Sequence, residues 1–208
     1  MALEDMTTLM KRSLLAFSLI TIATAAVAAP KTFTIVGEKL EYRNLATVES
    51  TTEFETFTGK TTKVSGSFTF DPSAKTGNGK LTVDLASLDT GIPTRNEHLR
   101  SAGWLDTAKH PTAVFQTTRV QSSGGDNYRV TGQFSLHGVT KTITTKATLK
   151  YRAESEATKK AGFAGNVTHL FTKFDVKLSD YGVKIPAVAD GKVNPTVTIT
   201  VSAYATAK

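Results

Sequence analysis

The densest group of polar and charged side chains in the sequence lies between residues 95 and 110. Its members are Arg95, Asn96, Glu97, His98, Arg100, Asp106 and His110. Glu97 and His98 could act as an acid/base pair, and the arginines could hold an anion. Adjacent residues rarely converge on one reacting atom, so we favour a structural role in which these charges cap the segment and form salt bridges. Binding of an anionic headgroup is the second interpretation, and catalysis is the third.

The histidines do not suggest a metal site. His98, His110, His137 and His169 are not spaced to share one local site, and the chain has no cysteine. No glycine-rich phosphate loop, nucleophile elbow or H-E-x-x-H motif is present. We therefore predict no metal, no cofactor, no catalytic residues and no enzyme activity.

Alternation of apolar and polar residues predicts the elements that carry these side chains. It runs through residues 64–71, 80–85, 128–136 and 196–203, with turn residues between these runs. Strands with one buried and one exposed face show this period. The alternation stops from Asp89 to His110, where Asn96 to Arg100 is typical of a short helix or ordered loop. We expect Leu99, Trp104 and Leu105 to turn inward from this insertion.

The N-terminus carries the features of an export signal. Lys11 and Arg12 precede an apolar run from Ser13 to Ala25, and the small residues before Pro30 suit signal peptidase. We predict a signal peptide over residues 1–28 and one domain over residues 29–208. A membrane anchor is the alternative, but the run is shorter than the roughly 20 residues that span a bilayer. Met10 is an alternative start site. We expect a periplasmic protein, with secretion as the alternative.

The formal net charge of +7 comes from residues spread along the chain. There is no basic cluster with interleaved aromatic residues, so we predict no nucleic-acid partner. The charge favours solvation and transient contact with an anionic membrane surface. The oligomeric state is left open, with a homodimer as one option.

Three motifs in the chain resemble those of the YceI family. The first runs from Val83 through Asp89-Thr90-Gly91 and the segment 95–101 to Trp104-Leu105-Asp106, His110-Pro111-Thr112 and Phe115. The second is Gly132 to Lys141, and the third comprises Phe174 and Asp180-Tyr181-Gly182. The resemblance implies an all-β fold, namely a lipocalin-like eight-stranded antiparallel β-barrel with a short helical insertion. Asn96, where the family often has Asp, and Leu178-Ser179, where it usually has Arg-Ser, depart from the pattern.

The family resemblance also implies an exported carrier for a long apolar amphiphile such as a polyisoprenoid, an isoprenoid quinone or a fatty-acid derivative. An eight-stranded barrel is just wide enough for one small ligand. The residues that we expect to line its cavity are Phe54, Phe57, Phe68, Phe70, Leu81, Val83, Leu85, Leu99, Trp104, Phe115, Phe134, Leu136 and Phe174. Arg95, His98 and Arg100 are candidate headgroup ligands at the barrel mouth. The alternative function is an envelope stress-related protein that acts through its surface, with a filled barrel and no ligand.

Overall fold

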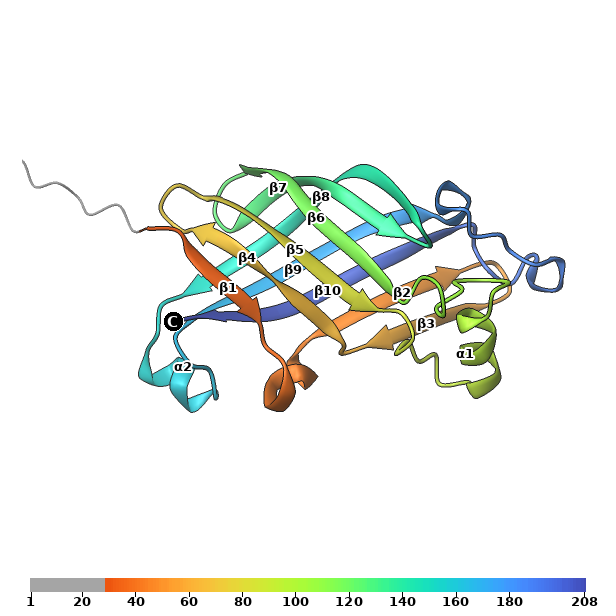
Figure 1. Ribbon diagram of the computed structural model, residues 1–208, viewed down its shortest axis with the longest axis horizontal. Helices are drawn as coiled ribbons and strands as arrows, with labels where there is room; N and C mark the ends of the chain where they lie inside the picture. The colour runs from red at the N-terminus through yellow and green to blue at the C-terminus, as the bar shows by residue number, and fades with distance from the viewer. Residues whose placement is uncertain (1–28) are drawn as a thin grey trace, which may run out of the picture.

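The computed structural model describes residues 29–208, so the predicted signal peptide lies outside the described residues. The described residues form one antiparallel sheet with short helices near its ends (Figure 1). Its strands are β1 (Lys31–Ile35), β2 (Leu45–Thr51), β3 (Thr56–Thr61), β4 (Val64–Asp71), β5 (Thr76–Asp84), β6 (Thr112–Ser122), β7 (Asn127–Leu136), β8 (Val139–Arg152), β9 (Asn166–Lys177) and β10 (Thr196–Ala207). Its helices are α1 (Pro93–Arg100) and α2 (Glu156–Lys160), with 3-10 segments η1 (Glu38–Arg43), η2 (Leu178–Tyr181) and η3 (Ala187–Ala189). No helix within residues 29–208 is long and apolar enough to cross a bilayer.

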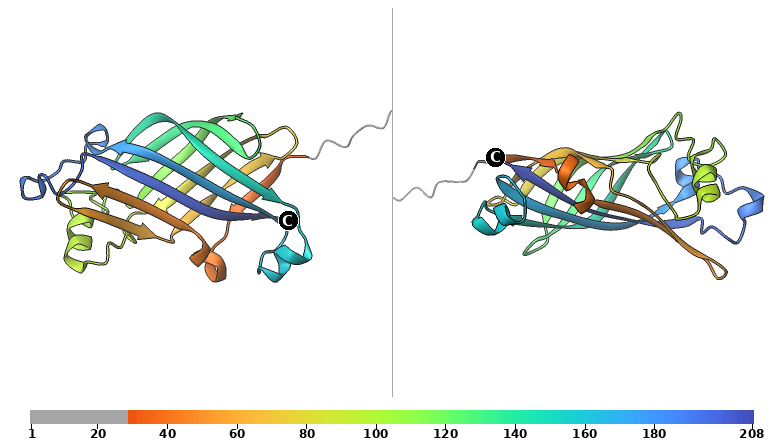
Figure 2. Two further views of the ribbon diagram at one scale, coloured as in Figure 1. Left: turned by 180° about the vertical axis from the view of Figure 1, so that it is seen from behind. Right: turned by 90° about the horizontal axis from the view of Figure 1, so that it is seen from below.

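Eight of the strands close into a barrel. Neighbouring strands follow the order β1-β4-β5-β6-β7-β8-β9-β10, and β10 pairs back with β1 to complete the circuit. The elongated barrel carries α1 at one end and α2 with the C-terminus near the other (Figures 1 and 2). The prediction of an eight-stranded antiparallel barrel with a short helical insertion is therefore confirmed.

Two strands that the eight-stranded prediction did not include, β2 and β3, extend the sheet beyond β10. β1 has 5 residues and β10 has 12, so β1 pairs with only part of the β10 edge. Backbone groups on an uncovered edge need another partner. The chain leaves the barrel after β1 through η1 and returns as β2, which pairs with β10 between Thr198↔Glu49 and Ser202↔Leu45. β3 then pairs with β2 as the outer strand of a hairpin.

Asn44 joins the two segments that share the edge of β10. Its side chain is fully buried between the end of η1 and the start of β2. The Asn44 Nδ2 group donates a hydrogen bond to the Val36 carbonyl oxygen at 2.6 Å, and Asn44 Oδ1 accepts one from the Tyr204 backbone N–H at 3.0 Å. The Val36 N–H donates in turn to the Tyr204 carbonyl oxygen at 2.9 Å. The amide thus satisfies backbone groups where neither β1 nor β2 reaches them.

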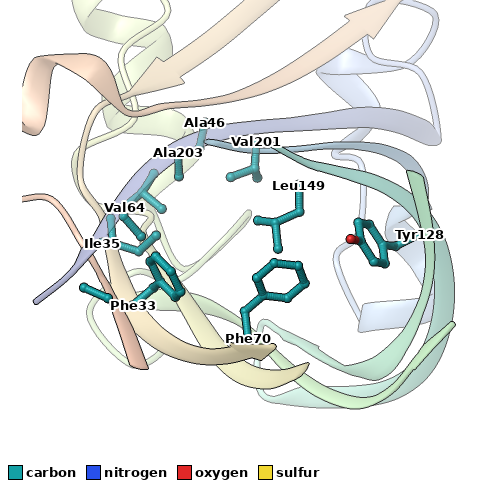
Figure 3. Packing of buried hydrophobic residues seen from close by; sticks show 11 residues of the cluster. Phe33, Ile35, Ala46, Val64, Phe70, Tyr128, Leu149, Val201 and Ala203 are labelled. Carbon is teal, nitrogen blue, oxygen red and sulfur yellow. The ribbon is translucent and has the colours of Figure 1, made fainter. Parts of the chain in front are cut away.

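The inward faces of the barrel strands form two apolar clusters. One contains Phe33, Phe70, Tyr128 and Leu149 and is drawn in Figure 3. The other, which includes Leu85, Leu88, Phe134, Leu178 and Tyr181, lies toward α1. Ile199 of β10 packs against both clusters, which places it between them. The alternation predicted from the sequence therefore describes the inner and outer faces of these strands.

Gly132 lies where β6 is irregular. Thr117 and Arg119 of β6 pair with Gly132 and Thr131 of β7, so Thr118 is the extra residue of a β-bulge. A Cβ atom on Gly132 would lie 2.5 Å from the Phe115 ring and 2.5 Å from the Gln116 carbonyl oxygen. Because Gly132 has no side chain, β6 and the Phe115 ring can lie close to β7 at this bend. A glycine within a strand often marks such a close approach.

We expect Asn44→Ala to destabilise the barrel by at least about 2 kcal/mol, because it leaves the Val36 carbonyl and the Tyr204 N–H buried without partners. Chemical denaturation monitored by circular dichroism measures this change. Lys39→Ala, an exposed substitution in η1, is the matched control and should leave the midpoint unchanged. Equal midpoints for both variants would show that the Asn44 amide does not support closure.

Candidate functional site

The barrel encloses a cavity with a volume of about 190 Å³. Its wall takes residues from β2 and from each of β4 to β10. It extends from Gly77 and Asn78 near the start of β5 to Leu88, just before the insertion, and Leu105 within it. Both apolar clusters therefore contribute to a single space that runs along the barrel.

The wall of the cavity is almost entirely apolar. Within residues 29–208, no charged side chain lines it. Thr145 and Thr172 are polar groups of the wall whose hydrogen bonds are made within the protein. Their hydroxyl groups are 3.1 Å apart, and Thr172 donates to the Lys146 carbonyl oxygen at 2.9 Å. A wall of this kind offers few partners to water, because an ordered buried water needs two to four polar groups.

The structure brings together nine of the thirteen residues that the sequence suggested for the lining. The nine that lie in the cavity wall are Phe68, Phe70, Leu81, Val83, Leu85, Phe115, Phe134, Leu136 and Phe174. All of them belong to barrel strands or, for Leu85, to the residue directly after one. Their contact with a ligand remains a prediction.

The other four residues lie outside the wall, which corrects their assignment to the lining. Phe54 is at the tip of the β2–β3 hairpin and is 79% exposed. Phe57, in β3, has the Arg95 guanidinium 4.5 Å above its ring. Trp104 packs onto the cluster near α1 from the insertion, and Leu99 is half-buried in α1. The hairpin and the insertion lie at the barrel end, so these four side chains stay outside the wall, whereas Leu105 of the insertion does reach it, as expected.

The sequence-based list contained no residue of the wall that β8 provides and, from β9, only Phe174. Thr145, Ala147 and Leu149 of β8 and Leu170 and Thr172 of β9 all line the cavity. In β8 these residues occupy every second position, with Lys146 and Thr148 between them. The period-two pattern was present there, although the threonine and alanine made its apolar face less obvious.

The proposed headgroup residues lie on the insertion and not on the cavity wall. Arg95 Nη1 forms an ion pair with Glu55 Oε1 at 2.6 Å, and its Nε donates to Thr90 Oγ1 at 3.2 Å. Arg100 Nη2 donates to the Leu88 carbonyl oxygen at 3.1 Å, and its Nε is buried without a partner among the described residues. His98 is exposed. These contacts favour the structural interpretation for the two arginines.

Asn96 organises the insertion through three hydrogen bonds. Its side-chain oxygen accepts from the Thr90 N–H at 2.8 Å and from the Thr90 hydroxyl at 2.7 Å. Its Nδ2 donates to Asp89 Oδ1 at 2.8 Å. Hydrogen bonds from the Gly91 N–H and from Asn96 lower the pKa of the Asp89 carboxyl group, because they stabilise its charged form. The stability that Asp89 contributes is therefore present at neutral pH and is lost as the pH falls through the lowered pKa.

The geometry gives little support to catalysis at this cluster. Glu97 and His98 are both exposed on α1, and neither lines the cavity. Among residues 29–208, no group of three or more histidine or acidic side chains is placed to hold a metal ion. His110 and His137 do approach each other, with ring centroids 5.0 Å apart, and His137 Nδ1 is 3.1 Å from the Tyr181 carbonyl oxygen.

A closed antiparallel barrel around an apolar cavity places the protein in the class of small lipocalin-like barrels. Residues 33–205 match the model of the YceI-like domain. The chain therefore belongs to the YceI family, as its motifs suggested.

Curated relatives share substantial sequence with this chain. It is 39% identical over 131 residues to a UPF0312 protein of Pseudomonas aeruginosa (strain LESB58), an alignment that covers 61% of this chain and 63% of the relative. The chain thus spans less than two thirds of that relative's length. It is 37% identical over 142 residues to a UPF0312 protein of Shewanella denitrificans, covering 65% of this chain and 70% of the relative.

Solved structures show the same fold at lower identity. BcnA of Burkholderia cenocepacia superposes with a TM-score of 0.68 at 24% identity, covering 80% of this chain and 98% of BcnA. A polyisoprenoid binding domain from Saccharophagus degradans gives a TM-score of 0.62 at 17% identity, covering 86% of this chain and 100% of that domain. At these identities the likeness establishes the fold.

We expect Asn96→Ala to destabilise the protein by about 2 to 3 kcal/mol, roughly 1 kcal/mol for each hydrogen bond lost. Thermal unfolding at pH 7 measures the change. Glu97→Ala, at an exposed neighbouring position of α1, is the control and should unfold as the parent does. A variant at position 96 that is as stable as the control would mean that Asn96 does not hold the insertion in place.

Proposed function

We propose that the protein is a non-catalytic carrier that encloses the tail of a long apolar amphiphile in its barrel. The observation that carries this proposal is the cavity itself, which runs between two apolar clusters and is lined by no charged residue in the described part of the chain. The polyisoprenoid binding domain of Saccharophagus degradans, which shares this fold, supports the choice of ligand class. Polyisoprenoids, isoprenoid quinones and fatty-acid derivatives all have suitable tails.

Burial of the tail supplies the affinity. Each buried methylene group contributes about 0.8 kcal/mol, so ten contribute about 8 kcal/mol, which corresponds to a micromolar dissociation constant before association costs. Phe68, Leu81, Val83, Val130 and Ile199 are only partly buried although they face the interior. They have apolar surface that a tail would cover.

The proposed location is the periplasm, with secretion as the alternative, because residues 1–28 have the sequence features of a signal peptide. A carrier in that compartment must take its ligand from a membrane and return it. Phe54 in the β2–β3 hairpin and Val188 in η3 are 79% and 82% exposed, and both segments project at the barrel end that carries α1 (Figures 1 and 2). Lys184 and Lys192 are exposed near η3. These groups suit transient contact with an anionic bilayer.

The direct test is mass spectrometry of organic extracts from protein purified without denaturation. We expect a lipid with a long apolar chain, or uptake of added prenyl or acyl chains by lipid-free protein. If the extracts contain no lipid and the protein takes up none, the carrier model is wrong, and action through the surface becomes the better explanation.

A second test fills the cavity from within. Ile199 lies between the two clusters, so Ile199→Trp should divide the cavity and weaken binding of a long acyl chain at least about tenfold. Thr200→Trp places the same side chain on the outer face of β10, because successive strand residues point to opposite sides. Fluorescence titration with a labelled long-chain lipid should show a loss for Ile199→Trp only. Equal binding by both variants would place the ligand outside the barrel.

A third test concerns the membrane. Phe54→Ser combined with Val188→Ser should slow ligand transfer to vesicles that contain anionic lipid, while leaving the affinity for the ligand unchanged. Tyr42→Ser is the control, since Tyr42 is 68% exposed on η1, away from this end. Stopped-flow transfer of a fluorescent lipid measures the rates. Unchanged transfer by the double variant would exclude these side chains as the contact.

A further inference from the structure

Tyr128 places a hydroxyl group inside the apolar barrel. It lies on the inner face of β7 in the cluster remote from α1, where it pairs with Ala147 of β8, and it lines the cavity. The residue is 5% exposed. Its ring meets the ring of Phe70 edge to face, with centroids 6.0 Å apart. Figure 3 shows the hydroxyl oxygen directed into the barrel interior, away from the strand that carries it.

The Tyr128 hydroxyl makes no hydrogen bond to any other residue in the range 29–208, whereas polar groups nearby are paired. The Tyr151 hydroxyl donates to Asn166 Oδ1 at 3.1 Å, and the Thr145 and Thr172 hydroxyl groups bond each other. Tyrosine hydroxyls in apolar surroundings usually find a partner. In the described part of the chain, Arg100 Nε is the one side-chain polar atom that is both fully buried and unpaired, so the Tyr128 oxygen borders the open space of the cavity. A ligand in the cavity can therefore reach it.

The surroundings keep this hydroxyl protonated and select against an anion. Burial, and to a smaller extent the charge of Asp126, raise the pKa of Tyr128. The group is therefore a neutral donor at physiological pH. No lysine or arginine among the described residues lines the cavity, so a phosphate or carboxylate there would lack a counter-charge.

We propose that Tyr128 donates a hydrogen bond to a neutral oxygen, of a carbonyl or alcohol group, on the ligand. This inference rests on the proposed carrier function and refines it. The oxygenated end of the ligand would lie between Phe70, Leu149 and Tyr128, and its tail would run toward Leu88 and Leu105 beside the insertion. The orientation is opposite to one in which Arg95, His98 and Arg100 bind the headgroup.

The experiment compares three probes with chains of equal length: oleyl alcohol, the corresponding octadecene hydrocarbon and oleate. Each displaces a fluorescent apolar dye from the lipid-free full-length mature protein. The parent should bind oleyl alcohol about fivefold to tenfold more tightly than the hydrocarbon, which corresponds to about 1 to 1.4 kcal/mol. In Tyr128→Phe this preference should disappear, while the affinity for the hydrocarbon stays the same or increases.

Tyr181→Phe is the control, because Tyr181 is also buried but lies outside the cavity wall. It should retain the preference for the alcohol. A preference that survives in Tyr128→Phe, or oleate binding more tightly than the alcohol, would overturn the assignment of Tyr128 while leaving the carrier function intact. If the parent bound none of the three probes, the carrier function itself would fail.

Discussion

The barrel depends on the hydrogen bonding of one edge of β10. β10 is longer than β1, so β1 and β2 pair with successive parts of the same edge, and the Asn44 side chain bonds the backbone between them. An open edge would leave buried donors and acceptors unpaired, and each costs about 1 to 3 kcal/mol. Closure at this strand brings the inner faces of all the barrel strands around one space. The cavity therefore depends on the pairing of β10 with β1 and β2.

The two ends of the barrel are built differently. Near α1, the insertion is held by the bonds of Asn96 to Thr90 and Asp89 and by the ion pair between Arg95 and Glu55. The charged residues there stabilise one another and leave the cavity wall uncharged. At the opposite end, the wall includes the Tyr128 hydroxyl, which has no protein partner in the described range, whereas the Thr145 and Thr172 hydroxyl groups bond each other. This contrast is the basis of the proposal that the interior takes an apolar chain with a neutral polar end.

The sequence determined much of the fold because a barrel strand shows its two faces locally. Apolar residues at every second position of β4, β5, β7 and β10 point inward, and this pattern needs no knowledge of distant residues. It accounts for seven of the nine predicted members of the cavity wall, and the other two, Phe115 and Phe174, belong to the family motifs. The insertion could be located in the same way, since its helix interrupts the alternation. The family motifs then indicated how many strands close the barrel.

Only the tertiary structure decided the features that depend on where a strand leaves the barrel wall and on which distant segments it contacts. Phe54 was expected in the cavity wall but lies on a hairpin tip beyond the barrel, because residue type does not show how far a strand stays in the wall. Glu55 reaches Arg95, and Asn44 reaches Tyr204, only after distant segments of the chain come together. Whether the Tyr128 hydroxyl has a partner likewise depends on which distant segments surround it in the fold. A sequence shows which polar groups are present, but the folded chain decides which of them find a partner.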